Sequence, residues 1–347
     1  MSTLRSLYHV ARADYLQRTR SQRFLAVLVL AASMGYLVNT SGLELVYTRQ
    51  LGTFDYEFYY GRSTAAWVGA KTALAGSFFL LFAGFYVLKN TLARERHTGM
   101  DTLVSSMATT DRLYLLGKWL SNIAVVFTIL AVLGAASVII HAVNGVGTTR
   151  IVPLIWPLLL LAAPLGFVLS GVALLFETID VLSGSIGNAV YFLGAIVAAN
   201  MAFSAPVSGG TVSTVVAYTE PIGYAAVYAA TYDALTATVQ GYSSGVPVFG
   251  SVSGGTEYTF TWAGGGWPVW MYLKSLFFLT VGAGLTAVGT VTFDRFTAAD
   301  RSLFSWSRLP IGGTETNADL DTESDTATNP EQDSAADTDV TELVGSL

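Results

Sequence analysis

Six long, nearly uncharged apolar runs alternate with polar segments along this chain. An α-helix needs about 20 consecutive apolar residues to cross the hydrocarbon core of a bilayer. The runs cover about 24–39, 67–88, 112–142, 152–176, 184–203 and 267–292. They predict an all-α polytopic membrane protein with six transmembrane helices. The composition, with 52% hydrophobic and 12% charged residues, excludes a soluble domain.

The polar segment 92–120, between the second and third predicted spans, holds seven charged residues, four of them within 94–101. Thr98 and Asp101 form a pair like a capping box, which predicts a short helix over 98–110. Its apolar positions recur at helical spacing: Met100, Leu103, Val104 and Met107. Such a helix either docks on a soluble partner or lies on the lipid surface. Composition alone does not choose between a docking helix and a loop helix without a partner.

Residues 1–23 predict a basic amphipathic helix on the cytoplasmic leaflet, ahead of a transmembrane domain over 24–293. The apolar face of this first helix is formed by Leu4, Leu7, Tyr8, Ala11 and Tyr15. A signal peptide is the alternative, but no small-x-small cleavage site and no twin Arg follow the basic region.

Two long segments, about 40–66 and 204–266, are predicted to be loops on the outer side of the membrane. The first contains several tyrosines, which is typical of an interfacial aromatic belt. The second contains no Lys or Arg. Within it, Pro221–Val239 predicts a helix whose stripe is formed by Tyr224, Tyr228, Tyr232 and Leu235.

The distribution of basic residues predicts the orientation. Thirteen Lys or Arg belong to the amino end, the 89–118 segment and the carboxyl end, whereas the predicted outer loops hold Arg49, Arg62 and Arg150. Positive residues accumulate on the cytoplasmic side of membrane proteins. We therefore expect a multi-pass protein of the cell membrane with both termini in the cytoplasm.

The end of the chain differs from the rest in charge. Residues 315–347 hold ten acidic groups and no basic one, within a predicted cytoplasmic tail over 294–347. Such a composition predicts disorder from about residue 315. Arg outnumbers Lys by 14 to 4, and this ratio together with the acidic tail suggests a halophilic source. An ordinary acidic disordered tail explains the composition of this tail equally well.

Several chemistries lack the residues they need. The chain has no cysteine and three histidines without metal-ligand spacing, which excludes a thiolate metal site and a metalloprotease. The G-x-S-x-G match at 241–245 lies in a polar loop without the strand-turn-helix of a hydrolase. Gly117 and Lys118 lack the upstream glycine of a nucleotide-binding loop. We expect no enzyme, no bound cofactor or metal and no nucleic-acid partner; if ATP drives this protein, another chain binds the ATP and Mg²⁺.

Lys71 and Lys274 lie inside predicted spans, where a charge indicates function by default because its burial is costly. Both fall within about two turns of the outer end, so their stems can reach the headgroups. We favour the hypothesis that both lysines reach the headgroups. The alternative places both lysines around an outward-facing substrate path. Small residues on the last two spans permit close helix approach: Ala195, Ala199, Gly282, Thr286 and Gly289.

The 92–120 segment also carries a resemblance. The pattern formed by Glu95, Arg96, Gly99 and Leu103, followed by Tyr114-Leu-Leu-Gly-Lys118 after the second of six spans, is similar to the coupling-helix region of ABC-2 type transporter permeases. The amino-terminal amphipathic helix resembles the same family. The spacing of the spans extends the likeness to roughly residues 1–295.

The resemblance implies a permease subunit that pairs with a second permease chain, as a homodimer or heterodimer, in the lipid bilayer, and with a separate ABC ATPase subunit. The residues implied in ATPase coupling are Glu95, Arg96, Gly99, Met100, Leu103, Val104 and Met107. Glu177 and Asp180 are candidates for a second, weaker contact. The family more often exports its substrates. The alternatives are a stand-alone secondary transporter or channel, and a membrane scaffold or sensor that uses the acidic tail.

Overall fold

A computed structural model describes residues 3–40, 44–51, 55–89, 91–92, 110–203, 207–208, 211–239, 242, 247–250 and 255–293. The chain divides into two units, Met1–Asp300 and Arg301–Leu347. All described residues belong to the first unit. The predicted disordered tail from about 315 lies outside the described residues.

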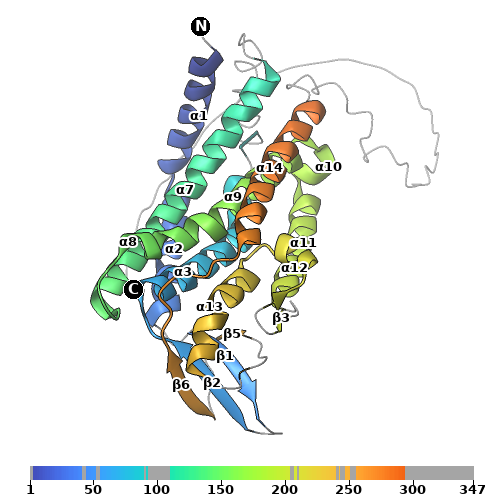
Figure 1. The fold of residues 1–347 in the computed structure, drawn as a ribbon. Coiled ribbons are helices and arrows are strands. Elements are labelled where there is room, and N and C mark those ends of the chain that lie inside the picture. Colours follow the sequence, from blue (N-terminus) through green and yellow to red (C-terminus); the bar gives the residue numbers. More distant parts are fainter. Residues whose placement is uncertain are drawn as a thin grey trace, which may run out of the picture. The chain divides into compact units, whose positions relative to one another are not determined.

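The described part contains six helical segments long and apolar enough to cross a membrane, which confirms the predicted fold class (Figure 1). The single-helix spans are α2 (Gln22–Thr40), α7 (Asp111–Asn144), α11 (Ser185–Phe203) and α14 (Val269–Thr292). The second span joins α3 (Ala65–Phe79), η1 (Leu80–Gly84) and α4 (Phe85–Leu88). The fourth joins α8 (Ile151–Pro157), η2 (Leu158–Ala162) and α9 (Ala163–Thr178). A short helix, α10 (Asp180–Ser183), follows it.

The second and fourth spans are interrupted by the π-helical turns η1 and η2. In the fourth span the interruption follows Pro157, which has no N–H to donate. Pro164 lies in the first turn of α9, where a missing N–H costs little. The sequence predicted kinks at both prolines; the structure has one break between them, of the kind that often marks functional positions in helices.

The first helix, α1 (Thr3–Thr19), packs along α7. The contact is close at Gly117, where a Cβ atom would lie 2.6 Å from Val10 Cγ1. The buried residues of α1 are Asp14 and Arg18, whereas Leu4 and Tyr8 are exposed. Of the predicted apolar face, Tyr15 packs on the bundle and its hydroxyl lies 2.9 Å from Thr128 Oγ1 of α7, so only the amino-terminal part of the face is exposed.

Glycines bring α9 and α14 into backbone contact. A Cβ atom on Gly171 would lie 2.5 Å from the Gly282 carbonyl oxygen, and one on Gly282 would lie 2.4 Å from the Phe167 carbonyl oxygen. The predicted close approach at Gly282 thus occurs within one chain. Ala195 and Ala199 of α11 are also buried within the unit.

Beyond one end of the bundle the chain forms a four-stranded sheet, which the sequence analysis did not predict. The strands are β1 (Glu44–Gln50), β2 (Tyr56–Gly61), β5 (Pro247–Gly250) and β6 (Thr256–Phe260), in the order β5-β1-β2-β6. The pairs β5–β1 and β1–β2 are antiparallel, and β2–β6 is parallel. The segments 40–66 and 204–266 are therefore not simple loops, because strands from both join in one sheet. A second, two-stranded pair joins β3 (Val207–Ser208) and β4 (Thr211–Val212).

Two helices lie between the fifth span and β5: α12 (Thr214–Thr219) and α13 (Tyr224–Thr238). The predicted aromatic stripe faces the sheet, because the Tyr228 and Tyr47 ring centroids lie 6.0 Å apart. Tyr47 donates to or accepts from Thr231 Oγ1 at 2.5 Å. Tyr47 also contacts Phe260 of β6, at 5.7 Å between ring centroids. The aromatic residues thus form the core between α13 and the sheet.

Candidate functional site

The end of the bundle that carries α1, called the α1 end below, has a buried group of charges. It lies where the second and fourth spans end and α7 begins (Figure 1). Lys118 Nζ of α7 lies 2.7 Å from Asp14 Oδ1, and Ser121 donates to Asp14 Oδ2 at 2.6 Å. Arg18, one turn further along α1, lies 2.8 Å from Asp14 Oδ2 and donates to the Leu88 carbonyl oxygen at 3.3 Å. This group joins α1, α7 and the end of the second span.

The electrostatics of this group favour an ionised Asp14. Burial raises the pKa of its carboxyl, but the positive charges of Arg18 and Lys118 and the hydrogen bonds from Lys118 and Ser121 outweigh burial and lower it to about 2. Each charge therefore has an opposite charge or a hydrogen-bond donor at contact distance. A buried carboxylate needs such partners to remain charged.

Glu177, in the last turn of α9, binds the start of the 92–120 segment. Its carboxylate accepts hydrogen bonds from the backbone N–H of Thr91 at 3.1 Å and of Leu92 at 2.6 Å. The Thr91 hydroxyl donates to the same carboxylate at 3.1 Å. The carboxylate thus accepts hydrogen bonds from two successive backbone N–H groups, as the side chain of an N-cap residue does at the start of a helix.

This position corrects one prediction. Glu177 is 3% exposed and its oxygens are bound within the chain, so its carboxylate does not face a partner protein. Asp180 is exposed and remains a candidate for the weaker partner contact. The predicted coupling residues Glu95, Arg96, Gly99, Met100, Leu103, Val104 and Met107 lie outside the described residues.

Lys89 fixes the end of the second span to the connection between spans four and five. Its ammonium group donates to the carbonyl oxygens of Leu182 at 3.1 Å and Gly184 at 3.2 Å, and to Asn188 Oδ1 at 2.8 Å. Burial lowers the pKa of Lys89, and the Glu177 carboxylate partly offsets this. The residues that precede segment 93–109 are thus tied to spans four and five, and Thr110 and Asp111, which follow it, begin α7.

At the other end of the bundle, called the sheet end below, the two span lysines pair with acids. Lys71 Nζ lies 3.0 Å from Glu44 Oε2, at the first residue of β1. Lys274 Nζ lies 3.5 Å from Glu220 Oε2, and Glu220 also accepts from the N–H groups of Ile222 and Gly223 ahead of α13. Lys71 and Lys274 are 1% and 2% exposed. The expectation that both reach the headgroups is therefore wrong, and each is neutralised inside the chain.

Sequence reasoning missed Asp14, Glu44 and Glu220. The signal for Asp14 was its spacing of four residues from Arg18, which puts both on one face of a helix. For Glu44 and Glu220 no local signal exists, because their partners lie 27 and 54 residues away.

The chain was compared with known protein families and with curated proteins. No family model matches the chain, and no curated protein matches it. Among the residues that the structure describes, no three His, Asp or Glu side chains gather as a metal site would require.

Proposed function

We propose that this multi-pass membrane protein is the permease subunit of an ABC-2 type transporter, which exports its substrate with energy from a separate ATPase. The observation that carries the proposal is the hydrogen bonding of Thr91 and Leu92 by Glu177. It ties the entry of the predicted coupling segment to the fourth span. A segment that transmits force needs such a rigid attachment to the helices it moves.

The mechanism follows from the contacts at the α1 end. ATP-driven closure of the ATPase dimer pushes on the helix over 98–110, through the apolar face that includes Leu103. Its displacement reaches the fourth span through Glu177 and reaches α1 through α7, because Lys118 binds Asp14. The spans rock against those of a second permease chain and open a path for the substrate. Asp180 makes a second contact with the ATPase.

In this proposal both termini lie in the cytoplasm and the sheet end lies outside. The cysteine-free chain allows a direct test with single cysteines at Thr211 and Thr316. An impermeant thiol reagent should label the Thr211→Cys variant in intact cells and the Thr316→Cys variant after lysis. Labelling of Thr316→Cys in intact cells would overturn this orientation.

A stand-alone secondary transporter requires inward-facing charges or broken helices near the middle of the membrane. The second and fourth spans are interrupted at η1 and η2, but neither interruption contains a charged residue. Within the described spans the carboxylates are Asp111 and Glu177, one at the start of α7 and the other at the end of α9. Lys71, Lys118 and Lys274 lie within about two turns of a helix end. This arrangement favours the subunit of a larger assembly.

The decisive experiment replaces Leu103 by Asp in the full chain. A charge placed in an apolar contact costs several kcal/mol, which weakens docking by about two orders of magnitude or more. We expect loss of ATPase co-purification and of transport-coupled ATP hydrolysis, with unchanged membrane insertion. Ser106→Ala, on another face of the predicted helix, is the matched control and should be nearly silent. If Leu103→Asp leaves both readouts unchanged, the segment does not couple to an ATPase.

A further inference from the structure

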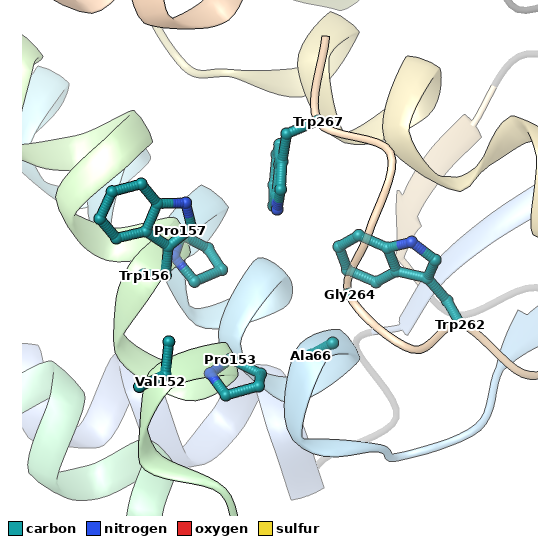
Figure 2. A pocket seen from close by; sticks show the side chains of 8 residues that line it. All are labelled: Ala66, Val152, Pro153, Trp156, Pro157, Trp262, Gly264 and Trp267. Atoms are coloured by element: carbon teal, nitrogen blue, oxygen red, sulfur yellow. The ribbon is translucent and has the colours of Figure 1, made fainter.

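A small cavity at the sheet end is enclosed by three tryptophans. Trp156 comes from α8, Trp262 follows β6, and Trp267 precedes α14. Figure 2 shows their indole rings around one space, with Trp156 and Trp262 on opposite sides in the view and Trp267 between them. The cavity has a volume of about 100 Å³. It is thus smaller than the roughly 300–1,000 Å³ of sites for drug-sized ligands, and admits a small chemical group.

The loop between β6 and α14 fixes the positions of two of these rings, Trp262 and Trp267. Trp262 is 3% exposed, and its Nε1–H donates to the Gly265 carbonyl oxygen at 3.0 Å. Its ring centroid lies 5.6 Å from that of Trp267, with an angle of 72° between the rings. Gly264 has a φ of +95°, and a Cβ atom there would lie 2.7 Å from Ala66 Cβ. Glycine is therefore required for the loop to approach α3 so closely.

The lining determines which ligands fit. Apart from the three indoles, it consists of the side chains of Ala66, Val152, Pro153 and Pro157 and of Gly264, none of which offers a polar side-chain atom. The indole N–H groups are donors, so the hydroxyl groups of a sugar, which must also donate, would find no side-chain acceptor in the lining and would lose hydrogen bonds to water, which is costly. A quaternary ammonium group has no hydrogen bonds to lose. Its charge is attracted by the faces of aromatic rings, most strongly by tryptophan.

We propose that this cavity, the tryptophan cage formed by Trp156, Trp262 and Trp267, binds the quaternary ammonium group of a small molecule or of a lipid headgroup. The rings of Trp262 and Trp267 are inclined by 72° to each other, and this arrangement suits a nearly spherical cation better than a flat ring. The site is independent of the coupling proposed for the α1 end. Its failure would therefore leave that function standing, and the reverse also holds.

The test uses the full chain purified in detergent and radiolabelled choline as the probe. Its neutral isostere, 3,3-dimethylbutan-1-ol, has the same shape without the charge. We expect choline to bind and the isostere to bind at least about tenfold more weakly, which is the contribution of a partly desolvated cation–π contact. Equal binding of the two compounds, or no binding of choline, would overturn the proposal.

Variants then localise the binding. Trp156→Ala removes a ring that is 42% exposed and should weaken choline binding about tenfold, and Trp156→Phe should weaken it less. Tyr272→Ala removes a ring of similar exposure, 44%, which does not line the cavity, and should have no effect. Unchanged binding in Trp156→Ala, checked for folding by size-exclusion chromatography, would refute the site.

Reconstitution into lipid distinguishes whether the quaternary ammonium group comes from a lipid headgroup or from a free small molecule. Choline binding is measured in nanodiscs of phosphatidylcholine and of phosphatidylglycerol. Weaker binding in phosphatidylcholine indicates that the lipid headgroup occupies the cage. Equal binding in both indicates a free ligand. Absence of choline binding in phosphatidylglycerol nanodiscs contradicts the proposal.

Discussion

The two ends of the helical bundle neutralise their buried charges in different ways. At the α1 end, Asp14 bonds to Lys118 and Ser121 of another helix, and Glu177 bonds to the backbone of residues 91–92. At the sheet end, each lysine pairs with one acid: Lys71 with Glu44, and Lys274 with Glu220. The α1 end links several helices and the entry of segment 93–109, whereas each pair at the sheet end holds one connecting segment on one span.

This difference bears on how the bundle transmits movement. A displacement at the α1 end stretches the bonds of Asp14 between α1 and α7 and the bonds of Glu177 between α9 and residues 91–92. At the sheet end a displacement of one span breaks one pair. The aromatic contacts of Tyr47 with Tyr228 and Phe260 add to the rigidity of the sheet side. The α1 end is therefore suited to pass on a movement, and the sheet end to keep its shape during it.

The largest effect is expected from Glu177→Ala. This change leaves the amides of Thr91 and Leu92 without their acceptor, and unpaired buried donors cost about 1–3 kcal/mol each. We expect the free energy of unfolding in detergent to fall by about 3 kcal/mol, with loss of transport-coupled ATP hydrolysis. Glu177→Gln keeps one acceptor oxygen, so its free energy of unfolding should fall by less than that of Glu177→Ala. Asp180 is exposed, so Asp180→Ala should change the free energy of unfolding by less than about 0.5 kcal/mol. Equal losses of stability in Glu177→Ala and Asp180→Ala would show that Glu177 does not link α9 to residues 91–92.

The next prediction is a difference in stability loss between the two lysine variants of the sheet end. In Lys274→Met the partner Glu220, whose side chain is 1% exposed, stays buried without its counter-charge, and the loss of one partner of a buried pair costs about 3 kcal/mol. In Lys71→Met the partner Glu44 is 32% exposed and can be hydrated, so we expect a loss of about 1 kcal/mol. Chemical unfolding of both variants measures the difference. A Lys274→Met/Glu220→Gln double variant should be more stable than the sum of the single losses predicts.

A result in which the two lysine variants lose equal stability would show that burial of the acid does not matter. The two ion pairs would then contribute equally, whatever the exposure of the acid. The comparison between the ends would rest on Asp14 and Glu177.

Much of the transmembrane architecture could be predicted from the sequence, because a span is a local property. Each run of apolar residues is long enough by itself, so the predicted bounds differ from α7 and α14 by about two residues. The sheet could not be predicted in the same way. Glu44–Gln50 is rich in residues that favour strands, but its partners on both sides are set by pairing with residues near 60 and near 248. Such pairing is not visible in a local pattern.

The candidate site shows the same limit. Lys71 and Lys274 are conspicuous in the sequence because charges are rare in spans. Their environment depends on Glu44 and Glu220, which lie in polar segments where acids are ordinary. Glu177 was recognised as important for its place between two spans, yet its carboxylate faces inward to Thr91 and Leu92. Residue type and position identified the side chains; the direction in which they point required the fold.

The last predicted effect is a pH dependence at the α1 end, which appears only in acid and comes from Asp14. Its pKa falls from 3.8 to about 2 on folding, because Arg18 and Lys118 together with hydrogen bonds outweigh the effect of burial. A carboxyl whose pKa is lower in the folded state stabilises the protein while it is ionised. The contribution is complete above about pH 4 and is lost as the pH falls towards 2. A shift of this size corresponds to about 2 kcal/mol.

We therefore expect the stability difference between the protein and its Asp14→Asn variant to be constant from about pH 7 to pH 5 and to shrink by about 2 kcal/mol below pH 4. Urea unfolding in detergent at a series of pH values measures it. Asp180→Asn is the control, because its carboxyl is exposed and has no cationic partner among the described ion pairs. A difference for Asp14→Asn that stays constant down to pH 2.5 would mean that the carboxylate is not held by Lys118 and Arg18. The α1 end would then lack its charge link between α1 and α7, and movement would have to pass through the close packing at Gly117 alone.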